Sequence, residues 1–313
     1  MISEKYGKIV KGVGGLYETR IVEEDGELSR ISCRAKGSLH RDEEKLLVGD
    51  NVKITIDTET PDGVAISECL PRQNALIRPP LSNLDYIFIV FAAKKPAPVL
   101  ETVDKLIAIA EHNEITPVIV ISKSDLSDSA ADEYAAIYRK AGFDVFVTSS
   151  SENFGVAELK EYIKTHVRCG KTAAFAGASG VGKSTLMNVL FEGLTLATAD
   201  ISKRIERGRH TTRHVEIFDI ESGADTGFLA DTPGFSMLDF SRFDFFKLSE
   251  LEDAFREFKS FRGRCRYSDC AHFGEGVEEC EIMKAVSEGK ISESRFESYR
   301  SIYRTLKNKN EYE

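Results

Sequence analysis

Residues 172–191 read TAAFAGASGVGKSTLMNVLF and decide the fold of this chain. They contain the pattern G-x-x-x-x-G-K-[ST] between an apolar run and a helical pattern, which is the context that a phosphate-binding loop requires. The glycines let successive backbone N–H groups and the start of the helix face phosphate oxygens, while the lysine neutralises the phosphates and the serine ligates Mg²⁺. An ordinary glycine-rich turn would not require Lys-Ser at that offset, so the pattern predicts a nucleotide site. The predicted nucleotide-binding residues of this loop are Gly177, Ala178, Ser179, Gly180, Val181, Gly182, Lys183, Ser184 and Thr185.

Two downstream segments are candidates for contacts with the metal and the γ-phosphate. Asp231-Thr-Pro-Gly234 follows the apolar run FLA, which suits a carboxylate that acts on Mg²⁺ and a Gly234 N–H that meets the γ-phosphate. Alone, these four residues would be no more than a good turn. In GRHTTR, residues 208–213, Thr212 is favoured over Thr211 as a hydroxyl that closes over Mg²⁺, and the alternative is a solvated polar loop. The predicted magnesium ligands are Ser184, Thr212 and Asp231.

Two strand ends upstream of the phosphate loop indicate guanine as the base. The segment SKSD, residues 122–125, follows the apolar run PVIVI, and its aspartate can accept from guanine N1–H and the exocyclic amine, a pair that adenine lacks. Residues 149–150 end another strand and can offer a backbone N–H to guanine O6. In isolation the first segment would be interpreted as a helix N-cap. The predicted base-binding residues are Ser122, Lys123, Ser124, Asp125, Ser149 and Ser150.

The order of these segments indicates a rearranged α/β fold. From Asp85 onward, strands alternate with helices, which predicts a doubly wound parallel sheet covered on both faces. In ordinary GTPases the phosphate loop comes first, whereas here the guanine segments precede it. A circular permutation leaves the nucleotide crevice intact because the strand ends still converge there. The segment after Asp231 then leads into the C-terminal part, so GTP hydrolysis is expected to move that part.

Changes in the sequence pattern along the chain predict three domains. Residues 1–70 alternate short apolar strands with glycine and acidic turns, which fits a small β-barrel, with the five-stranded oligonucleotide-binding type as one option and a barrel without ligand as the alternative. Residues 71–240 form the predicted permuted GTPase domain, entered through a proline-rich connector. Residues 241–313 are mainly helical and contain a cysteine-rich loop.

The cysteine-rich loop has the composition of a zinc site. Three thiols and one imidazole within one short segment can fill a tetrahedral Zn²⁺ site, which favours one structural zinc over catalysis. Scattered buried cysteines beside a surface histidine are the alternative, and they explain Cys33, Cys69 and Cys169 more simply as small core residues. The predicted zinc ligands are Cys265, Cys270, His272 and Cys280.

Composition limits the remaining possibilities. Of 313 residues, 42% are hydrophobic and 30% are charged, and the longest apolar run falls far short of the ~20 residues that span a bilayer. The N-terminus MISEKYGKIV has no apolar signal core, so we expect a cytoplasmic protein without a membrane partner. The net charge of −9 argues against coating nucleic acid through bulk charge. Two basic clusters, at residues 203–213 and 259–266, either track an RNA backbone or are solvated faces.

Taken together, these motifs resemble the family of circularly permuted, ribosome small-subunit-dependent GTPases of the RsgA (YjeQ) type. The resemblance rests on VGD at 48–50, NLD at 83–85, GASGVGKSTLMN, GRHTTR, DTPGF and the Cys–Cys–His–Cys loop. It implies a monomer that binds the small ribosomal subunit and its rRNA late in maturation and hydrolyses GTP to GDP and phosphate when the subunit stimulates it. The alternatives are a GTP-dependent switch for a non-ribosomal RNA or protein, and a binding protein whose nucleotide is only structural.

The chain departs from the family pattern at two places, and it shares with the family a difference from common GTPases. Ser122 stands where the family has asparagine, and its hydroxyl is expected to tether less well. The metal loop is two residues longer and lacks a proline. Phe235 occupies the place where common GTPases have a glutamine that orients water, and the family pattern makes His210 the candidate catalytic residue for that task, with an RNA-facing or solvent histidine as the alternative.

Overall fold

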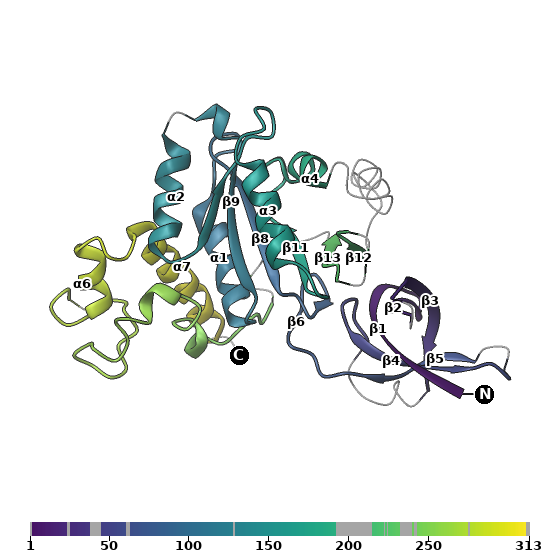
Figure 1. Cartoon of the computed structure of the whole chain (residues 1–313). Helices are drawn as coiled ribbons and strands as arrows, with labels where there is room; N and C mark the ends of the chain where they lie inside the picture. The colour runs from purple at the N-terminus through teal and green to yellow at the C-terminus, as the bar shows by residue number, and fades with distance from the viewer. Residues whose placement is uncertain are drawn as a thin grey trace. The chain divides into compact units, whose positions relative to one another are not determined.

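The computed structural model describes residues 2–23, 26–37, 45–60, 63–127, 129–191, 215–221, 223, 225–231, 240, 243–274 and 276–310, apart from the side chains of Asp231 and Asn310. The chain forms two compact units, each assembled from segments far apart in sequence (Figure 1). The first unit consists of Met1–Tyr86, Lys160–Phe175 and Ser184–Phe235. The second unit consists of Ile87–Leu159, Ala176–Lys183 and Ser236–Glu313.

A closed five-stranded barrel makes up the N-terminal part of the first unit. Its strands are β1 (Ile2–Val13), β2 (Leu16–Val22), β3 (Leu28–Ala35), β4 (Asn51–Asp57) and β5 (Val64–Cys69). β1 pairs antiparallel with β2 and β4, β2 pairs with β3, β4 pairs with β5, and a parallel pairing of β3 with β5 closes the ring. Alternate apolar side chains fill the interior, among them Ile9, Ile21, Val52, Ile54 and Ile66. This closure is that of an oligonucleotide-binding-type barrel, as the sequence predicts.

The same unit contains a small group of strands from the predicted GTPase domain. β13 (Phe228–Asp231) runs parallel to β11 (Thr172–Ala176) and antiparallel to β12 (Glu216–Asp219). β12 also pairs with β1 of the barrel. Arg20, which is buried on β2, donates from Nε to Asp219 over 2.8 Å and fastens the barrel to this group. A short hairpin of β6 (Ala75–Leu76) and β7 (Leu81–Ser82) follows the barrel in the chain.

The second unit contains the strands that carry the guanine segments. β8 (Tyr86–Ala92), β9 (Thr116–Ser122) and β10 (Asp144–Val147) lie in the order β10-β9-β8, and β9 and β10 are parallel. All seven side chains of β8 are buried, which is the pattern of a parallel strand covered on both faces. Helices α1 (Leu100–His112) and α2 (Ala130–Lys140) pack on β9, as Figure 1 shows. The predicted α/β architecture is confirmed.

The C-terminal part of this unit is mainly helical, as predicted. It contains the short 3₁₀ helices η2 (Leu248–Glu250) and η3 (Arg256–Phe258), and helices α6 (Glu281–Ser287) and α7 (Glu293–Asn310). α7 packs against α1, so the C-terminal helix covers the helix that precedes β9. Helices α3 (Val156–His166) and α4 (Lys183–Phe191) each have residues in both units. Among the described residues, none of the helices combines the length and apolar character that crossing a bilayer requires.

Candidate nucleotide site and metal centre

The phosphate loop, residues 177–183, leaves β11 and enters α4 in a conformation that needs glycine. Gly177 has φ +140°, and a Cβ at that position would lie 2.0 Å from the carbonyl oxygen of Val90. Gly180 and Gly182 also have positive φ, at +80° and +96°. A side chain at these positions would be strained, so the glycines are what lets this backbone curl.

The lysine of the loop lies against the backbone of the loop itself. Lys183 Nζ donates to the carbonyl oxygens of Gly177 at 2.8 Å and Ala178 at 2.7 Å. Burial lowers the pKa of Lys183 below the ordinary lysine value. The ammonium is thus held at the loop, at the place where a phosphate would meet the N–H groups.

Residues at the tip of β9 contact backbone carbonyl oxygens of the phosphate loop. Ser122 Oγ lies 2.6 Å from the carbonyl oxygen of Val181. Lys123, in the left-handed region with φ +55°, donates to the carbonyl oxygen of Gly180 at 2.7 Å. These contacts bring together segments almost 60 residues apart in sequence (separations of 59 and 57 residues). The structure therefore places the strand end of the predicted guanine segment directly beside the phosphate loop.

Asp125, the residue predicted to bind the guanine base, is held by a serine that follows the neighbouring strand β10. Ser149 Oγ donates to Asp125 Oδ1 over 2.6 Å, and the Ser151 hydroxyl lies 2.9 Å from Ser149 Oγ. The hydrogen bond from Ser149 holds the pKa of the Asp125 carboxyl below its usual value, so the group is an anionic acceptor. Sequence reasoning assigned Ser149 a backbone contact and missed this hydroxyl, and it did not include Ser151. The signal available in the sequence was the run of three serines, residues 149–151, at the end of a strand.

Only one of the two backbone donors predicted for guanine O6 is free within the described part of the chain. The Ser149 N–H donates to the carbonyl oxygen of Phe154 over 3.0 Å, and Phe154 returns a second hydrogen bond. The Ser150 N–H makes no hydrogen bond with the described residues. Ser150 is therefore the donor that a guanine O6 could use.

The structure describes only part of the predicted magnesium site. β13 places Asp231 one residue beyond the pair Ala174–Ala230, at the carboxyl end of the strand beside β11. Ser184 and Thr185 are exposed in the first turn of α4. The remaining predicted residues lie outside the described part of the chain: His210, Thr211, Thr212, Gly234, Phe235 and the basic cluster at 203–213.

The four predicted zinc ligands form one compact cluster. Their ligand atoms all lie within 4.8 Å of one another. His272 Nδ1 is 3.7 Å from Cys265 Sγ, 3.4 Å from Cys270 Sγ and 3.3 Å from Cys280 Sγ. A tetrahedron with metal–sulfur bonds of about 2.3 Å and a metal–nitrogen bond of about 2.0 Å has edges of about 3.5–3.8 Å. The donor set and its spacing therefore fit zinc.

The protein around this cluster supports a bound cation. Burial raises the pKa of the Cys270 and Cys280 thiols, so a cation is what would hold them as thiolates. His272 is 3% exposed, and its other nitrogen, Nε2, lies 3.4 Å from Glu252 Oε1. Nε2 makes no hydrogen bond with the described residues, although the Glu252 carboxylate lies within ion-pair distance of it. A carboxylate behind a ligating imidazole fixes the tautomer that leaves Nδ1 free for the metal.

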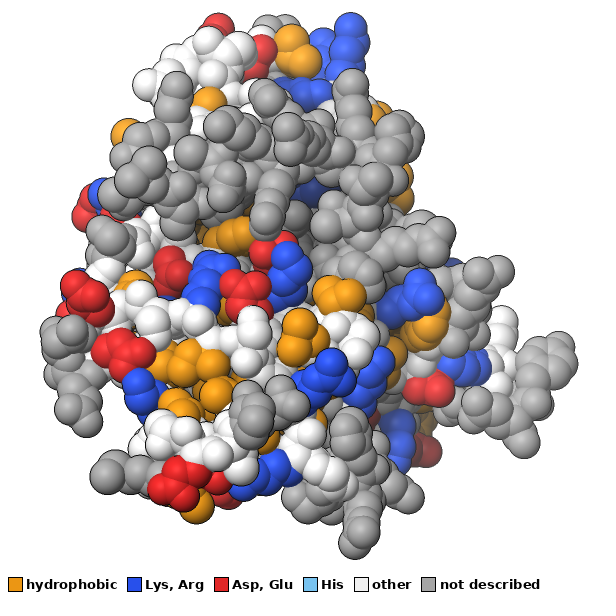
Figure 2. Space-filling model, turned by 90° about the vertical axis from the view of Figure 1, so that its right-hand side faces the viewer, with side chains coloured by type: hydrophobic (Ala, Val, Ile, Leu, Met, Phe, Trp, Pro, Cys, Tyr) orange, Lys and Arg blue, Asp and Glu red, His pale blue; other side chains and the backbone are white. Residues whose placement is uncertain are grey.

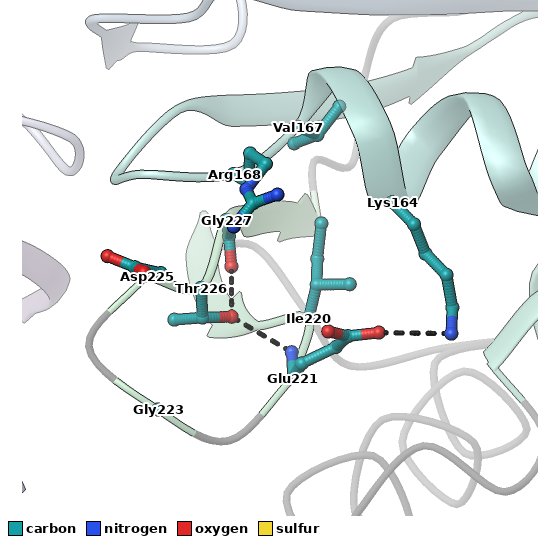
Figure 3. Close-up of a pocket in the computed structure, with 9 residues that line it drawn as sticks. All are labelled: Lys164, Val167, Arg168, Ile220, Glu221, Gly223, Asp225, Thr226 and Gly227. Atoms are coloured by element: carbon teal, nitrogen blue, oxygen red, sulfur yellow. Dashed lines mark hydrogen bonds and ion pairs between the residues drawn. The ribbon is translucent and has the colours of Figure 1, made fainter.

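A separate cavity of about 360 Å³ lies in the first unit (Figure 3). Its residues precede β11 and β13, whereas the phosphate loop follows β11. Three of its lining residues interact with one another, since Lys164 meets Glu221 at 3.3 Å and Thr226 Oγ1 accepts from the Glu221 N–H at 2.9 Å (Figure 3). None of the predicted nucleotide or metal residues lines it.

Comparison with known proteins agrees with this arrangement. The RsgA GTPase family matches residues 69–241, and the RsgA N-terminal domain matches residues 6–64. A small ribosomal subunit biogenesis GTPase RsgA from Alkaliphilus metalliredigens is 37% identical over 98% of this chain and 99% of its own length. A protein named small ribosomal subunit biogenesis GTPase RsgA 2 from Listeria monocytogenes is 40% identical over 97% of this chain and 98% of its own.

Two solved structures share the whole fold. The crystal structure of YjeQ from Thermotoga maritima superposes with a TM-score of 0.77 at 32% identity, covering 97% of this chain and 99% of that one. The crystal structure of YloQ, a circularly permuted GTPase, superposes with a TM-score of 0.77 at 29% identity, covering 98% and 96%. This chain belongs to the RsgA family of circularly permuted GTPases.

Proposed function

We propose that this protein binds the small ribosomal subunit during its late maturation and hydrolyses GTP to GDP and phosphate when the subunit stimulates it. The observation that carries the proposal is a match along 98% of the chain to a relative named as a small ribosomal subunit biogenesis GTPase. The contact of Ser122 and Lys123 with the phosphate loop supports it, because it joins the guanine and phosphate segments in one site. We further propose that the protein is a cytoplasmic monomer without a membrane partner.

Each residue of the proposed site has a defined task. Asp125 accepts from guanine N1–H and the exocyclic amine, and the Ser150 N–H donates to O6. Residues 177–185 surround the phosphates, and Lys183 neutralises their charge. Water attacks the γ-phosphorus, the bond to the β-phosphate oxygen breaks, and GDP and phosphate leave. We assign the orientation of that water to His210.

Two metal ions complete the proposal. Magnesium, held by Ser184, Thr212 and Asp231, would neutralise charge between the β- and γ-phosphates, with Gly234 donating to the γ-phosphate. Zinc would be held by the compact cluster formed by Cys265, Cys270, His272 and Cys280, with all four positions filled by protein, so its role is structural.

The proposed domains are a barrel at 1–70, a GTPase at 71–240 and a zinc-binding helical domain at 241–313, with the first and last contacting rRNA. The face in Figure 2 has basic side chains interspersed with acidic and hydrophobic ones, so contacts on it would be local rather than driven by bulk charge.

On the barrel, a cavity of about 380 Å³ is lined by Tyr17, Lys45 and a glycine-rich hairpin. An aromatic ring beside a cation is suited to stacking on an unpaired base.

Two basic side chains of the cluster at 259–266 are available to contact an RNA backbone. Arg262 pairs with Glu252 at 2.9 Å, and Arg266 pairs with Glu279 at 2.9 Å. Lys259 and Arg264 are exposed and make no side-chain ion pair with the described residues. These two side chains are the proposed phosphate-backbone contacts of the zinc-binding domain.

Sedimentation with purified small subunits tests the proposal. We expect the protein to sediment with the subunit in the presence of a non-hydrolysable GTP analogue and to be released more readily with GDP. Subunit addition should also accelerate GTP turnover, and Lys183→Ala should abolish that turnover. A GTPase that turns over GTP but neither binds nor responds to the subunit would favour the switch for another partner. A protein that binds GTP without any turnover would favour a structural nucleotide.

A further inference from the structure

Two buried cations of the barrel contact a strand of the predicted GTPase domain. Lys8 on β1 and Arg20 on β2 stand directly opposite each other in the β1–β2 ladder, and they are 8% and 7% exposed. Like charges in that arrangement repel each other and need compensation. Part of it comes from the Phe228 ring of β13, whose centroid lies 4.8 Å from the Arg20 guanidinium and 5.6 Å from Lys8 Nζ.

The Arg20 guanidinium also holds β12. Its Nε donates to Asp219 Oδ1 over 2.8 Å, and Asp219 Oδ2 lies 3.7 Å from Arg30 on β3. The hydrogen bond and the ring contact of Arg20 therefore both go to strands outside the barrel. Because its side chain is buried, Arg20 is placed to join parts of the protein rather than to contact an external RNA.

Strand β13 leads from this arginine to the predicted magnesium site. It pairs with β11 on one side and with β12 on the other, and Phe228 and Asp231 are its first and last residues. Three residue steps of about 3.3 Å separate these two positions by about 10 Å. A strand that is hydrogen-bonded on both sides and closely packed transmits strain from one end to the other. The barrel therefore contacts one end of the strand whose other end carries the predicted magnesium ligand.

We propose that Arg20 couples the barrel to β13, so that binding of the barrel to the small subunit acts on the metal end of the nucleotide site and accelerates GTP hydrolysis. The inference rests on the proposed function and names the route by which the subunit acts. Arg20 is neither an RNA contact nor a catalytic residue in this scheme. Without the subunit, the ladders with β11 and β12 hold β13 in place, so intrinsic turnover does not depend on this arginine.

Arg20→Met should uncouple the barrel from hydrolysis. We expect the variant to sediment with small subunits and to keep intrinsic GTP turnover within about 2-fold of wild type. Stimulation by the subunit should fall by at least about 5-fold, the lower end of typical couplings between two sites. Asp219→Asn breaks the same hydrogen bond from the β12 side with less disturbance of the core, and it should also reduce stimulation. If both act through one bond, the double variant should lose no more stimulation than Arg20→Met alone.

Arg256 in the second unit offers a matched control. Like Arg20, it donates from Nε to a carboxylate, that of Glu111 at 2.9 Å, and its guanidinium lies 4.2 Å from the centre of a phenylalanine ring, that of Phe143. It joins η3 to α1 and has no part in the barrel or in β13. Arg256→Met should therefore keep stimulation close to the wild-type level.

Hydrogen exchange of the β13 amides reports on the strand itself. In wild type, exchange at residues 228–231 should change when the small subunit binds in the presence of a non-hydrolysable GTP analogue. In Arg20→Met this subunit-dependent change should be smaller. A merely structural role of Arg20 would lower the thermal midpoint of the free protein and leave the subunit-dependent change as it is in wild type.

Three results would overturn the inference. Full stimulation in both Arg20→Met and Asp219→Asn would remove the coupling, and an equal loss in Arg256→Met would show that the effect is not specific to the barrel. Loss of sedimentation in Arg20→Met would make the arginine part of subunit binding instead. These outcomes leave the proposed function intact as long as the subunit stimulates the wild-type protein. A wild-type protein that the subunit does not stimulate would overturn the proposed function, and this inference with it.

Discussion

Arg295 on α7 donates from Nη1 to Asp104 Oδ1 on α1 over 2.7 Å, and both side chains are only 1% exposed. The same guanidinium makes two hydrogen bonds to Glu257 in η3, at 2.7 and 3.1 Å. One buried arginine therefore joins the C-terminal helix, the 3₁₀ turn before the metal loop and the helix that precedes β9. A charge buried this deeply is stable only while its partners are present.

Arg295→Ala should lower the free energy of unfolding by about 3–5 kcal/mol, because it leaves two carboxylates buried without their cation. Urea denaturation followed by circular dichroism measures the change. Lys105→Ala is the control, since Lys105 pairs with Glu101 one turn along α1 near the surface and should cost no more than about 0.5 kcal/mol. Equal losses in the two variants would show that the buried pair is not what holds α7.

Lys8 should make the barrel-containing unit more stable as pH rises above about 8. Burial lowers the pKa of Lys8 from the ordinary 10.5 to about 8. The Lys8 Nζ lies 3.4 Å from Thr172 Oγ1 and faces the Phe228 ring. Between these values the unfolded chain binds more protons than the folded one, so the free energy of unfolding rises with pH from this group, by at most about 1.4 kcal/mol per pH unit.

Lys8→Met should remove that contribution while keeping the length of the side chain. Urea denaturation of both proteins at pH 7.5 and 9.5 measures the difference, with wild type gaining more stability than the variant between the two values. Parallel pH dependences in the two proteins would refute the assignment to Lys8.

Glu252→Gln should weaken zinc binding by at least about 10-fold, because the Glu252 carboxylate, 3.4 Å from His272 Nε2, would accept the Nε2 proton when Nδ1 binds the metal and would so fix the imidazole tautomer. Competition with a chromophoric zinc chelator measures the affinity. Asp253→Asn is the matched control, since Asp253 is the exposed neighbouring acid and pairs with Arg262 rather than with a metal ligand. Equal zinc affinity in wild type and Glu252→Gln would exclude this role.

His210→Ala should reduce turnover in the presence of small subunits while GTP affinity stays within about 2-fold of wild type. The reason is that P-loop hydrolysis depends on positioning, and a phenylalanine at 235 cannot orient water. Turnover is measured with and without subunits under saturating GTP. Normal stimulated turnover in the variant would remove His210 from the mechanism.

The sequence predicted the fold, the glycine-dependent backbone of the phosphate loop and the compact cysteine–histidine cluster, because these signals are local. The glycine spacing at 177–182 needs only backbone geometry, and the four zinc ligands lie within one short loop. The contact of the Ser122 hydroxyl with the Val181 carbonyl oxygen could not be predicted, since it depends on which loop packs against the tip of β9. The burial of Arg295 could not be predicted either, because it lies in a charged helix and its partner Asp104 is 191 residues away in the chain. Tertiary contacts of this kind decide which charged side chains become buried.

The central claim is that shuffled segments form one site that reads guanine and that the small subunit activates. Hydrolysis of GTP and XTP by Asp125→Asn, with and without purified small subunits, tests it most directly. The account predicts that the variant loses subunit-stimulated GTP hydrolysis, gains subunit-stimulated XTP hydrolysis, and loses both when Lys183→Ala is added. A variant that hydrolyses GTP at the wild-type rate and gains no activity on XTP would contradict it.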